Sequence, residues 1–283
     1  MIVSGSASQA FAAALSDATG MDLAELKHRR FPDGELLAGA PGFDADRAVL
    51  VAAPVSSDAH VELLQLQDAV REAGATDVTT VVPYTGHARE NCTFSTDRAL
   101  SSDAMARAVS TGTDRVVVVN PHEEAVCDYF DVPCETVDAA PRLAEPLPRD
   151  LTDPLFLAPD WETTGMAETV RDAYGAGATD YFETVPDRES ATIDVALQEA
   201  AVAGRDVVLV NDVVATGTTT AASVDGLYDR GANRVFVACV HPVMAVDARN
   251  KLERAGVEAV YGTDTVEGPV SVVSAAPAVA DVL

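Results

Sequence analysis

The feature that most constrains the fold of this chain is a unit that occurs twice: an apolar strand, a polar loop, a helix, a glycine and a second apolar strand. In the first copy the strand lies at residues 46–51, the helix at 61–72, the glycine at 74 and the second strand at 78–82. In the second copy the strand lies at 204–210, the helix ends at 229, the glycine is at 231 and the second strand lies at 235–240. A partial copy begins at Gly112 and continues into a strand at 116–119. Short, continuously apolar, β-branched strands separated by helices are typical of a parallel sheet covered on both faces. The glycine supplies a left-handed helix end.

This repetition predicts an α/β protein with two similar domains, each a mostly parallel sheet flanked by helices. A length of 283 residues accommodates two domains of ordinary size, or one large domain. The proline-rich stretch 141–154 is the predicted boundary, although surface loops can have the same composition. We therefore expect an N-terminal domain over residues 1–143 and a C-terminal domain over residues 144–283.

The chain is strongly acidic, with a formal net charge of −26. A charge of this size repels nucleic acids and anionic membranes, so we expect neither as a partner. Lys27 and Lys251 are the only lysines among the 19 basic residues, and the acidic residues are spread along the whole chain. This distribution favours a halophilic protein, whose self-repulsion is screened by salt, over an ordinary acidic cytosolic protein.

Neither a membrane span nor a secretion signal is evident. No apolar run approaches the roughly 18 residues of a spanning helix, and residues 1–5 contain no basic region before an apolar stretch. The four cysteines, Cys92, Cys127, Cys134 and Cys239, fit no zinc-binding spacing. We therefore expect a cytoplasmic protein whose cysteines are buried or incidental thiols in a reducing compartment.

A candidate ligand site follows the strand at 204–210, because open parallel sheets bind ligands beyond the carboxyl ends of their strands. The glycine here lets the backbone approach a ligand closely. The threonine hydroxyls and the free N–H groups of the following helix favour an anion. A threonine-rich helix cap would have a similar sequence, but the position after a buried strand favours a phosphate cradle. The residues concerned are Asn211, Asp212, Thr216, Gly217, Thr218, Thr219 and Thr220.

This stretch resembles the loop of phosphoribosyltransferases and ribose-phosphate pyrophosphokinases that binds phosphoribosyl pyrophosphate (PRPP). Other segments resemble the pyrophosphokinases in particular, and they occur in order along nearly the whole chain. They are Ser-Gly-Ser-Ala at 4–7, Arg-Phe-Pro-Asp-Gly-Glu at 30–35, Leu-Leu-Gln-Leu-Gln-Asp-Ala at 63–69, Pro-Tyr-Thr-Gly-His-Ala-Arg at 83–89, Pro-His at 121–122, Phe-Asp-Val-Pro at 130–133, Ala-Pro-Asp at 158–160, Thr-Asp-Thr at 263–265 and Ser-Ala-Ala-Pro at 274–277. The resemblance implies two phosphoribosyltransferase-like domains.

The resemblance also implies a reaction: transfer of a pyrophosphoryl group from magnesium-ATP to the C1 hydroxyl of ribose 5-phosphate, which gives PRPP and AMP. It implies Mg²⁺ as cofactor and a homo-oligomer, a dimer or a hexamer, in which the loop at 30–35 serves a neighbouring subunit. Phe31, Asp33 and Glu35 would then hold adenine, and Arg89 would contact ATP. A tight Pro-Asp-Gly turn has the same sequence for structural reasons, and it is compatible with this role.

The remaining implied roles concern the transferred phosphates and the sugar. His122 would lie by the ATP phosphates and the metal, and Asp160 by the sugar or the metal. A lone histidine after a strand is more often structural, and an aspartate at such a position is often a helix cap. Asp212, with Asn211, would bind the ribose hydroxyls, and residues 216–220 the 5-phosphate.

The resemblance is incomplete in the second domain. A catalytic lysine and a nearby arginine of the family align with Thr184 and Pro186, and Arg188 is the one cation nearby. We therefore assign catalysis to Arg188 and His122. Two functions stay open: an active PRPP synthase, and a catalytically silent paralogue that binds nucleotide or sugar phosphate and assembles with an active synthase. A phosphoribosyltransferase would not explain the matches before residue 140, and no Walker-type phosphate loop is present.

Overall fold

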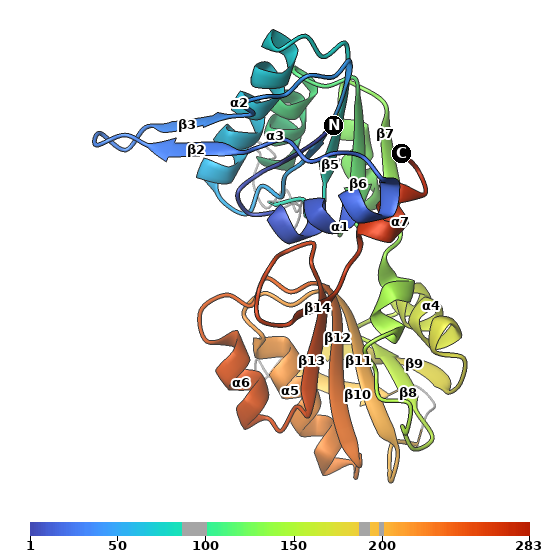
Figure 1. Ribbon diagram of the computed structural model, residues 1–283. Helices are drawn as coiled ribbons and strands as arrows, with labels where there is room; N and C mark the ends of the chain where they lie inside the picture. The colour runs from blue at the N-terminus through green and yellow to red at the C-terminus, as the bar shows by residue number, and fades with distance from the viewer. Residues whose placement is uncertain (87–100, 187–192, 198–200) are drawn as a thin grey trace. The chain divides into compact units, whose positions relative to one another are not determined.

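The computed structural model describes residues 1–86, 101–186, 193–197 and 201–283 (Figure 1). These residues form two compact units. The first contains Met1–Asp138, Asp264–Glu267 and Ser274–Leu283, and the second contains Ala139–Thr263 and Gly268–Val273. None of the described helices is long and apolar enough to cross a membrane.

This division differs from the predicted one, in which a single boundary between residues 143 and 144 separates the two domains. The predicted linker instead begins with the 3-10 helix η3 (Ala140–Ala144), which packs against helix α4 (Thr164–Tyr174) and buries Leu143 completely. At the other end, helix α7 (Ala276–Ala280) buries Val279 and packs against helix α1 (Gln9–Thr19) of the first unit. Apolar burial therefore decides which unit each of these segments joins.

The first unit is built on a five-stranded parallel sheet with the order β1-β4-β5-β6-β7. Continuous apolar runs form its buried strands, as expected for a sheet covered on both faces. The strands are β1 (Ile2–Ser4), β4 (Arg47–Val51), β5 (Asp77–Val82), β6 (Arg115–Val119) and β7 (Cys134–Val137). The helices besides α1 and α7 are α2 (Ser57–Glu72), α3 (Ser101–Ser110) and the 3-10 helix η2 (Glu124–Tyr129).

Helix α2 begins earlier than the predicted stretch 61–72. Ser56 caps it, because its side-chain oxygen accepts a hydrogen bond from the N–H of Ala59 at 3.1 Å. The same helix holds a separate antiparallel hairpin of β2 (Lys27–Arg30) and β3 (Leu36–Gly39). Gln65 of α2 accepts from the N–H of Ala38 at 2.7 Å and donates to the carbonyl of Leu36 at 2.9 Å. The hairpin tip thus projects from a fixed base (Figure 1).

The second unit is built on a seven-stranded sheet with the order β10-β9-β8-β11-β12-β13-β14, in which β9 and β10 are antiparallel and the other pairs are parallel. Its strands are β8 (Leu155–Ala158), β9 (Ala178–Pro186), β10 (Ile193–Leu197), β11 (Asp206–Val213), β12 (Arg234–His241), β13 (Ala259–Thr263) and β14 (Ser271–Val273). Its helices besides α4 are α5 (Thr218–Asp229) and α6 (Ala248–Arg254). The predicted fold class, two α/β units with mostly parallel sheets flanked by helices, is confirmed.

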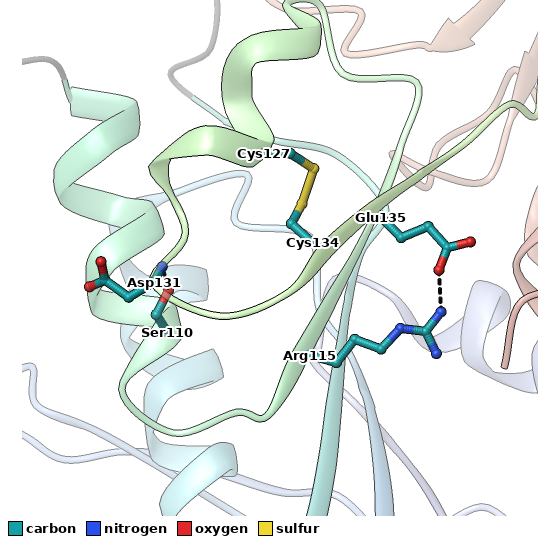
Figure 2. The surroundings of a disulfide bond; sticks show 6 residues. All are labelled: Ser110, Arg115, Cys127, Asp131, Cys134 and Glu135. Carbon is teal, nitrogen blue, oxygen red and sulfur yellow. Dashed lines mark hydrogen bonds and ion pairs between the residues drawn. A yellow bond between two sulfur atoms is a disulfide. The ribbon is translucent and has the colours of Figure 1, made fainter.

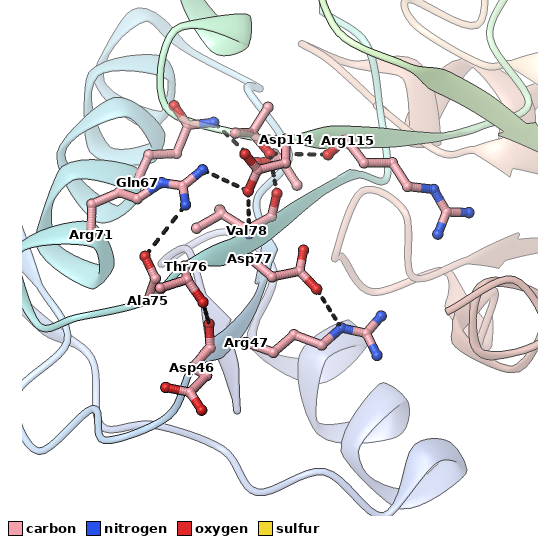
Figure 3. A network of polar contacts seen from close by, with 12 residues as sticks. Asp46, Arg47, Gln67, Arg71, Ala75, Thr76, Asp77, Val78, Asp114 and Arg115 are labelled. Atoms are coloured by element: carbon pink, nitrogen blue, oxygen red, sulfur yellow. Dashed lines mark hydrogen bonds and ion pairs between the residues drawn. The ribbon is translucent and has the colours of Figure 1, made fainter.

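Polar networks hold the amino-terminal edges of both sheets. In the first unit the carboxylate of Asp114 accepts from Arg71 and from the N–H of Val78, both at 2.7 Å (Figure 3). In the second, buried Asp206 accepts from Arg234 at 2.6 Å and from the N–H of Thr152 at 2.7 Å. These contacts occupy the edges opposite to the strand ends where ligands of parallel sheets bind.

The structure corrects the prediction for two cysteines. Cys127, in η2, forms a disulfide with Cys134 at the start of β7 (Figure 2). The turn between them brings their Cα atoms to 5.3 Å, a separation that a disulfide requires. A spacing of seven residues along the chain does not reveal this proximity, because the turn itself creates it. Cys239 is a buried free thiol, and Cys92 lies outside the described residues.

Candidate functional site

The candidate site lies where strand β11 leads into helix α5 at the carboxyl edge of the second sheet. Gly217 joins them with a φ of +68°, a left-handed conformation that favours glycine. A Cβ atom at this position would lie 3.2–3.3 Å from atoms of Ala248 at the start of α6. The glycine therefore meets two requirements at once, the turn into α5 and the close approach of α6.

The threonines form the first turn of α5 and the residue before its glycine. The first N–H groups of a helix lack partners within the helix and carry its positive end. The exposed hydroxyl of Thr216 lies 3.4 Å from that of Thr218, so two hydroxyl groups meet at this helix end. Hydroxyl and N–H donors at a helix N-terminus suit a phosphate. Residues 216–220 thus form the end of the loop and the first turn of α5, and phosphate binding by them stays a prediction.

Asn211 and Asp212 lie at the end of strand β11 and not in a loop. The strand was predicted to end at residue 210, but it continues to Val213. Asn211 pairs with Cys239 of β12. The thiol of Cys239 accepts from the N–H of Val214 at 3.1 Å. Burial, and then the charge of Asp212, raise the pKa of Cys239, so it stays a thiol. No pattern in the sequence indicated that this thiol contacts the backbone of the loop after β11.

A second loop, residues 242–247, lies beside the first. The N–H of Met244 donates to the carbonyl of Val214 at 3.0 Å, and that of Ala245 to Ala215 at 2.9 Å. Met244 and Val246 have φ values of +47° and +59°, which is strained for a β-branched residue such as valine. Strain of this kind is concentrated at ligand-binding segments.

Lys251 of helix α6 reaches the same place. Its ammonium group donates to the carbonyl of Thr216 at 3.2 Å and to the hydroxyl of Thr218 at 3.1 Å. It also forms an ion pair with Asp247 at 2.9 Å. Sequence analysis missed this residue, because Thr218 and Lys251 are separated by 33 positions along the chain and no local pattern indicates their contact.

Asp160 follows β8 in the same unit. Its carboxylate accepts from the N–H and the hydroxyl of Thr163, both at 2.9 Å, in the turn that leads into α4. The N-cap of α4 is Thr163, so Asp160 stabilises the turn before the helix and is not the helix cap itself. The next residue, Trp161, is 69% exposed.

The predicted adenine-binding residues lie at the hairpin tip in the first unit. The N–H of Phe31 donates to the carbonyl of Glu35 at 2.9 Å, and Asp33 accepts from the N–H of Glu35 at 3.2 Å. Arg29 lies over the Phe31 ring, 4.8 Å from its centroid. These contacts close the turn and leave the side chains of Asp33 and Glu35 exposed.

His122 is also exposed in the first unit, just beyond strand β6. Asn120, with a φ of +34°, precedes it and donates to Asp138 at 2.7 Å. Among the described residues no cluster of three histidine, cysteine or acidic side chains could hold a metal. His122 and Asp160 belong to different units, so each is described only within its own.

Two predicted residues, Arg89 and Arg188, lie outside the described residues. Thr184 and Pro186 lie in the backbone of β9, paired with Val195 and Ile193 of β10. The segment where the family has its lysine and arginine is therefore part of an antiparallel pair of strands up to Pro186.

Comparison with known proteins gives the family. Residues 1–112 match the model for the N-terminal domain of ribose phosphate pyrophosphokinase. The chain is 56% identical to the ribose-phosphate pyrophosphokinase of Halobacterium salinarum, with 100% of both chains covered. It is 36% identical to that of Methanosarcina mazei, with 100% of this chain and 94% of the relative covered.

The fold agrees with this result. The structure matches that of phosphoribosylpyrophosphate synthetase from Mycobacterium smegmatis with a TM-score of 0.82 at 23% identity, over 100% of this chain and 96% of the other. The match extends over both units, as the resemblance along nearly the whole sequence predicted. The chain belongs to the ribose-phosphate pyrophosphokinase family.

Proposed function

We propose that this protein transfers the pyrophosphoryl group of ATP to the C1 hydroxyl of ribose 5-phosphate, releasing AMP and forming PRPP. The observation that carries the proposal is the turn at residues 216–220, where hydroxyl groups and the first N–H groups of α5 lie at the carboxyl edge of the sheet. Membership of the family supports the same reaction.

In this proposal the second unit binds the sugar phosphate. The hydroxyl of Thr218 donates a hydrogen bond to the 5-phosphate, together with the free N–H groups at the start of α5. Asp212 and Asn211 are half-buried at the end of β11, where they can bind the ribose hydroxyls. Phosphoryl transfer depends mainly on positioning and on charge stabilisation, so fixing the sugar in this way is the contribution of this unit.

The first unit binds the nucleotide in this proposal. Phe31, Asp33 and Glu35 take the adenine, and His122 and Arg89 take the ATP phosphates. The hairpin that carries the adenine residues projects from its unit (Figure 1). The side chains of Asp33 and Glu35 at its tip are exposed. This shape supports a homo-oligomer, a dimer or a hexamer, in which the tip completes the nucleotide site of a neighbouring copy.

Mg²⁺ is the proposed cofactor, and Asp160 is the carboxylate of the second unit that we expect beside it. Magnesium is usually held by one or two protein carboxylates, water and substrate phosphates, so a protein cluster of three ligands is not required. Thr163 fixes the Asp160 carboxylate in one orientation, which suits a ligand role. The bound ion would neutralise charge on the phosphates.

A second candidate function is a silent paralogue that binds nucleotide or sugar phosphate and assembles with an active synthase. It is supported by the sequence resemblance, in which Thr184 and Pro186 align with the family's catalytic lysine and arginine. Loss of one preorganised group that stabilises transition-state charge typically lowers the rate by roughly 10²–10³. The active protein therefore needs a replacement cation, and we assign that role to Arg188.

An assay of AMP release from magnesium-ATP and ribose 5-phosphate at high salt separates the two functions. We expect turnover in the wild-type protein and a loss of about 10²-fold or more in Arg188→Ala. Arg249→Ala is the matched control, because Arg249 is exposed and paired with Glu253 on the surface of α6. Binding of both substrates without turnover would support the silent paralogue, and absence of binding would contradict both functions.

A further inference from the structure

The one lysine of the second unit contacts the proposed phosphate-binding turn directly. The ammonium group of Lys251 lies 3.1 Å from the hydroxyl oxygen of Thr218 and 3.2 Å from the carbonyl oxygen of Thr216. The side chain is 30% exposed, so it lies against the protein and does not extend into solvent. A basic group is thus placed within the first turn of α5.

The position of this lysine is set by backbone packing. Ala248, at the start of α6, lies so close to Gly217 that a Cβ atom on the glycine would come within 3.2–3.3 Å of it. The hydrogen bonds of Met244 and Ala245 attach the loop before α6 to the loop before α5. Because α6 is held against the turn, Lys251 approaches it from a rigid element, as a binding site requires.

The contacts of Lys251 also orient the hydroxyl of Thr218. A hydroxyl oxygen accepts two hydrogen bonds and donates one. Lysine is only a donor, so Thr218 accepts from Lys251, and it also accepts from the hydroxyl of Thr216 at 3.4 Å. With both acceptor positions used, the proton of Thr218 is left to donate to a further acceptor, and a phosphate oxygen is such an acceptor.

Charge leads to the same residue. In a chain of net charge −26, a sugar phosphate needs a local cation to offset the general repulsion. Other basic residues of this unit are engaged elsewhere: Arg234 with Asp206, Arg205 with Asp153, and Arg249 with Glu253. Lys251 brings positive charge to the turn itself.

Asp247 holds the lysine from the other side. Its carboxylate lies 2.9 Å from the ammonium group, one turn earlier along the chain. The hydrogen bond from Lys251 is the main cause that lowers the pKa of Asp247, so the carboxylate is ionised near neutral pH. The three donors of the ammonium group thus have three acceptors: Thr216, Thr218 and Asp247.

We propose that Lys251, oriented by Asp247, is a positioning residue for the phosphate group of ribose 5-phosphate, acting through the hydroxyl of Thr218. The inference rests on the proposed function, since it names a further residue of the same sugar-phosphate site. It predicts that removal of the lysine weakens binding of the phosphorylated sugar and leaves binding of ATP unchanged.

Calorimetry with ribose 5-phosphate and, separately, with ATP at one fixed salt concentration tests this. We expect Lys251→Met to weaken ribose 5-phosphate binding by about 10- to 100-fold, the range for loss of a hydrogen bond to a charged group, with ATP affinity within about twofold. Lys251→Arg should restore most of the loss, because it keeps the charge and the donors. Arg249→Met, the same change of charge on the same helix, should have no effect on either ligand.

A double variant separates positioning from general electrostatics. If the lysine acts through Thr218, then Thr218→Val should remove most of the effect of Lys251→Met, so the two changes together cost less than the sum of both. Fully additive losses would overturn this part of the proposal. Asp247→Asn tests the orientation of the lysine and serves as the second variant if Lys251→Met does not fold. We expect it to weaken ribose 5-phosphate binding less than Lys251→Met does.

The possible results distinguish the inference from the function on which it rests. Wild-type protein that binds no ribose 5-phosphate would contradict the proposed function. Wild-type protein that binds it, with Lys251→Met binding equally well, would overturn the role of the lysine alone. Equal weakening of ATP and sugar phosphate would indicate a general structural effect and would also overturn it.

Discussion

At the scale of single residues, Gly217 has the strictest requirement in the candidate site. Its φ of +68° disfavours any residue other than glycine, and a Cβ atom here would lie only 3.2–3.3 Å from atoms of Ala248. Thr216 and Thr218 on either side of it depend on this geometry for their hydroxyl contact. A change at this glycine is therefore expected to alter both stability and phosphate binding.

We predict that Gly217→Ala lowers the free energy of unfolding by about 1–3 kcal/mol, since a left-handed non-glycine residue is strained, and that it weakens ribose 5-phosphate binding. Gly204→Ala is the matched control. Its φ of +78° is similar, but no atom lies within 4 Å of its added Cβ, and it precedes β11 at the opposite edge of the sheet. Urea unfolding and calorimetry measure the two effects. Equal loss of binding in both variants would show that strain alone is responsible.

At the scale of secondary-structure elements, buried Asp206 ties strands β11 and β12 to the segment before β8. It accepts from Arg234 at 2.6 Å, from Asn233 at 2.8 Å and from the N–H of Thr152 at 2.7 Å. Burial by itself would raise the pKa of Asp206, but these hydrogen bonds outweigh it and lower the pKa below its ordinary value. The ionised carboxylate is therefore part of the folded state.

This shift predicts a loss of stability in acid. Because the folded pKa lies below the unfolded value of about 3.9, the contribution is fully present above that pH and is lost as the pH falls through the folded pKa. We expect Asp206→Asn to cost about 2 kcal/mol at pH 7 and to reduce the stability lost between pH 5 and pH 2. Asp150→Asn is the control, since Asp150 is 80% exposed and lies 3.8 Å from the same arginine. Urea unfolding across pH measures both, and identical pH profiles for Asp206→Asn and the wild type would contradict the prediction.

At the scale of the whole molecule, the net charge of −26 is the dominant electrostatic property. Screening shortens the range of repulsion from about 10 Å at 0.1 M salt to about 3 Å at 1 M. The relatives from Halobacterium salinarum are 56% identical to this chain in sequence. A protein of this charge is expected to fold more stably as salt rises.

We predict that the urea midpoint rises between 0.1 M and 2 M potassium chloride at pH 7. The same titration near the isoelectric point of about 4.3 should show a much smaller rise, because little net charge remains to be screened. Circular dichroism follows both. A salt dependence of equal size at the two pH values would assign the effect to general salting-out and not to charge repulsion.

The local patterns of the sequence predicted most of the fold and part of the site. Continuous β-branched runs predicted the parallel strands, because such runs are stable only where both faces are buried. The stretch 216–220 predicted an anion-binding turn, because glycine, threonines and a helix start are adjacent in the chain. Strand β11 continues past its predicted end at residue 210, because Asn211 gains a partner in β12 that the chain itself does not display.

By itself, the sequence determined the fold class, the family and the turn that we propose to bind phosphate, since each depends on neighbouring residues or on segments in a recognisable order. Only the tertiary structure decided that α7 packs on α1, that Cys127 pairs with Cys134, and that Lys251 reaches Thr218. Each of these depends on the path of the chain between the partners. Packing of whole helices and turns sets that path, and a local pattern does not record it.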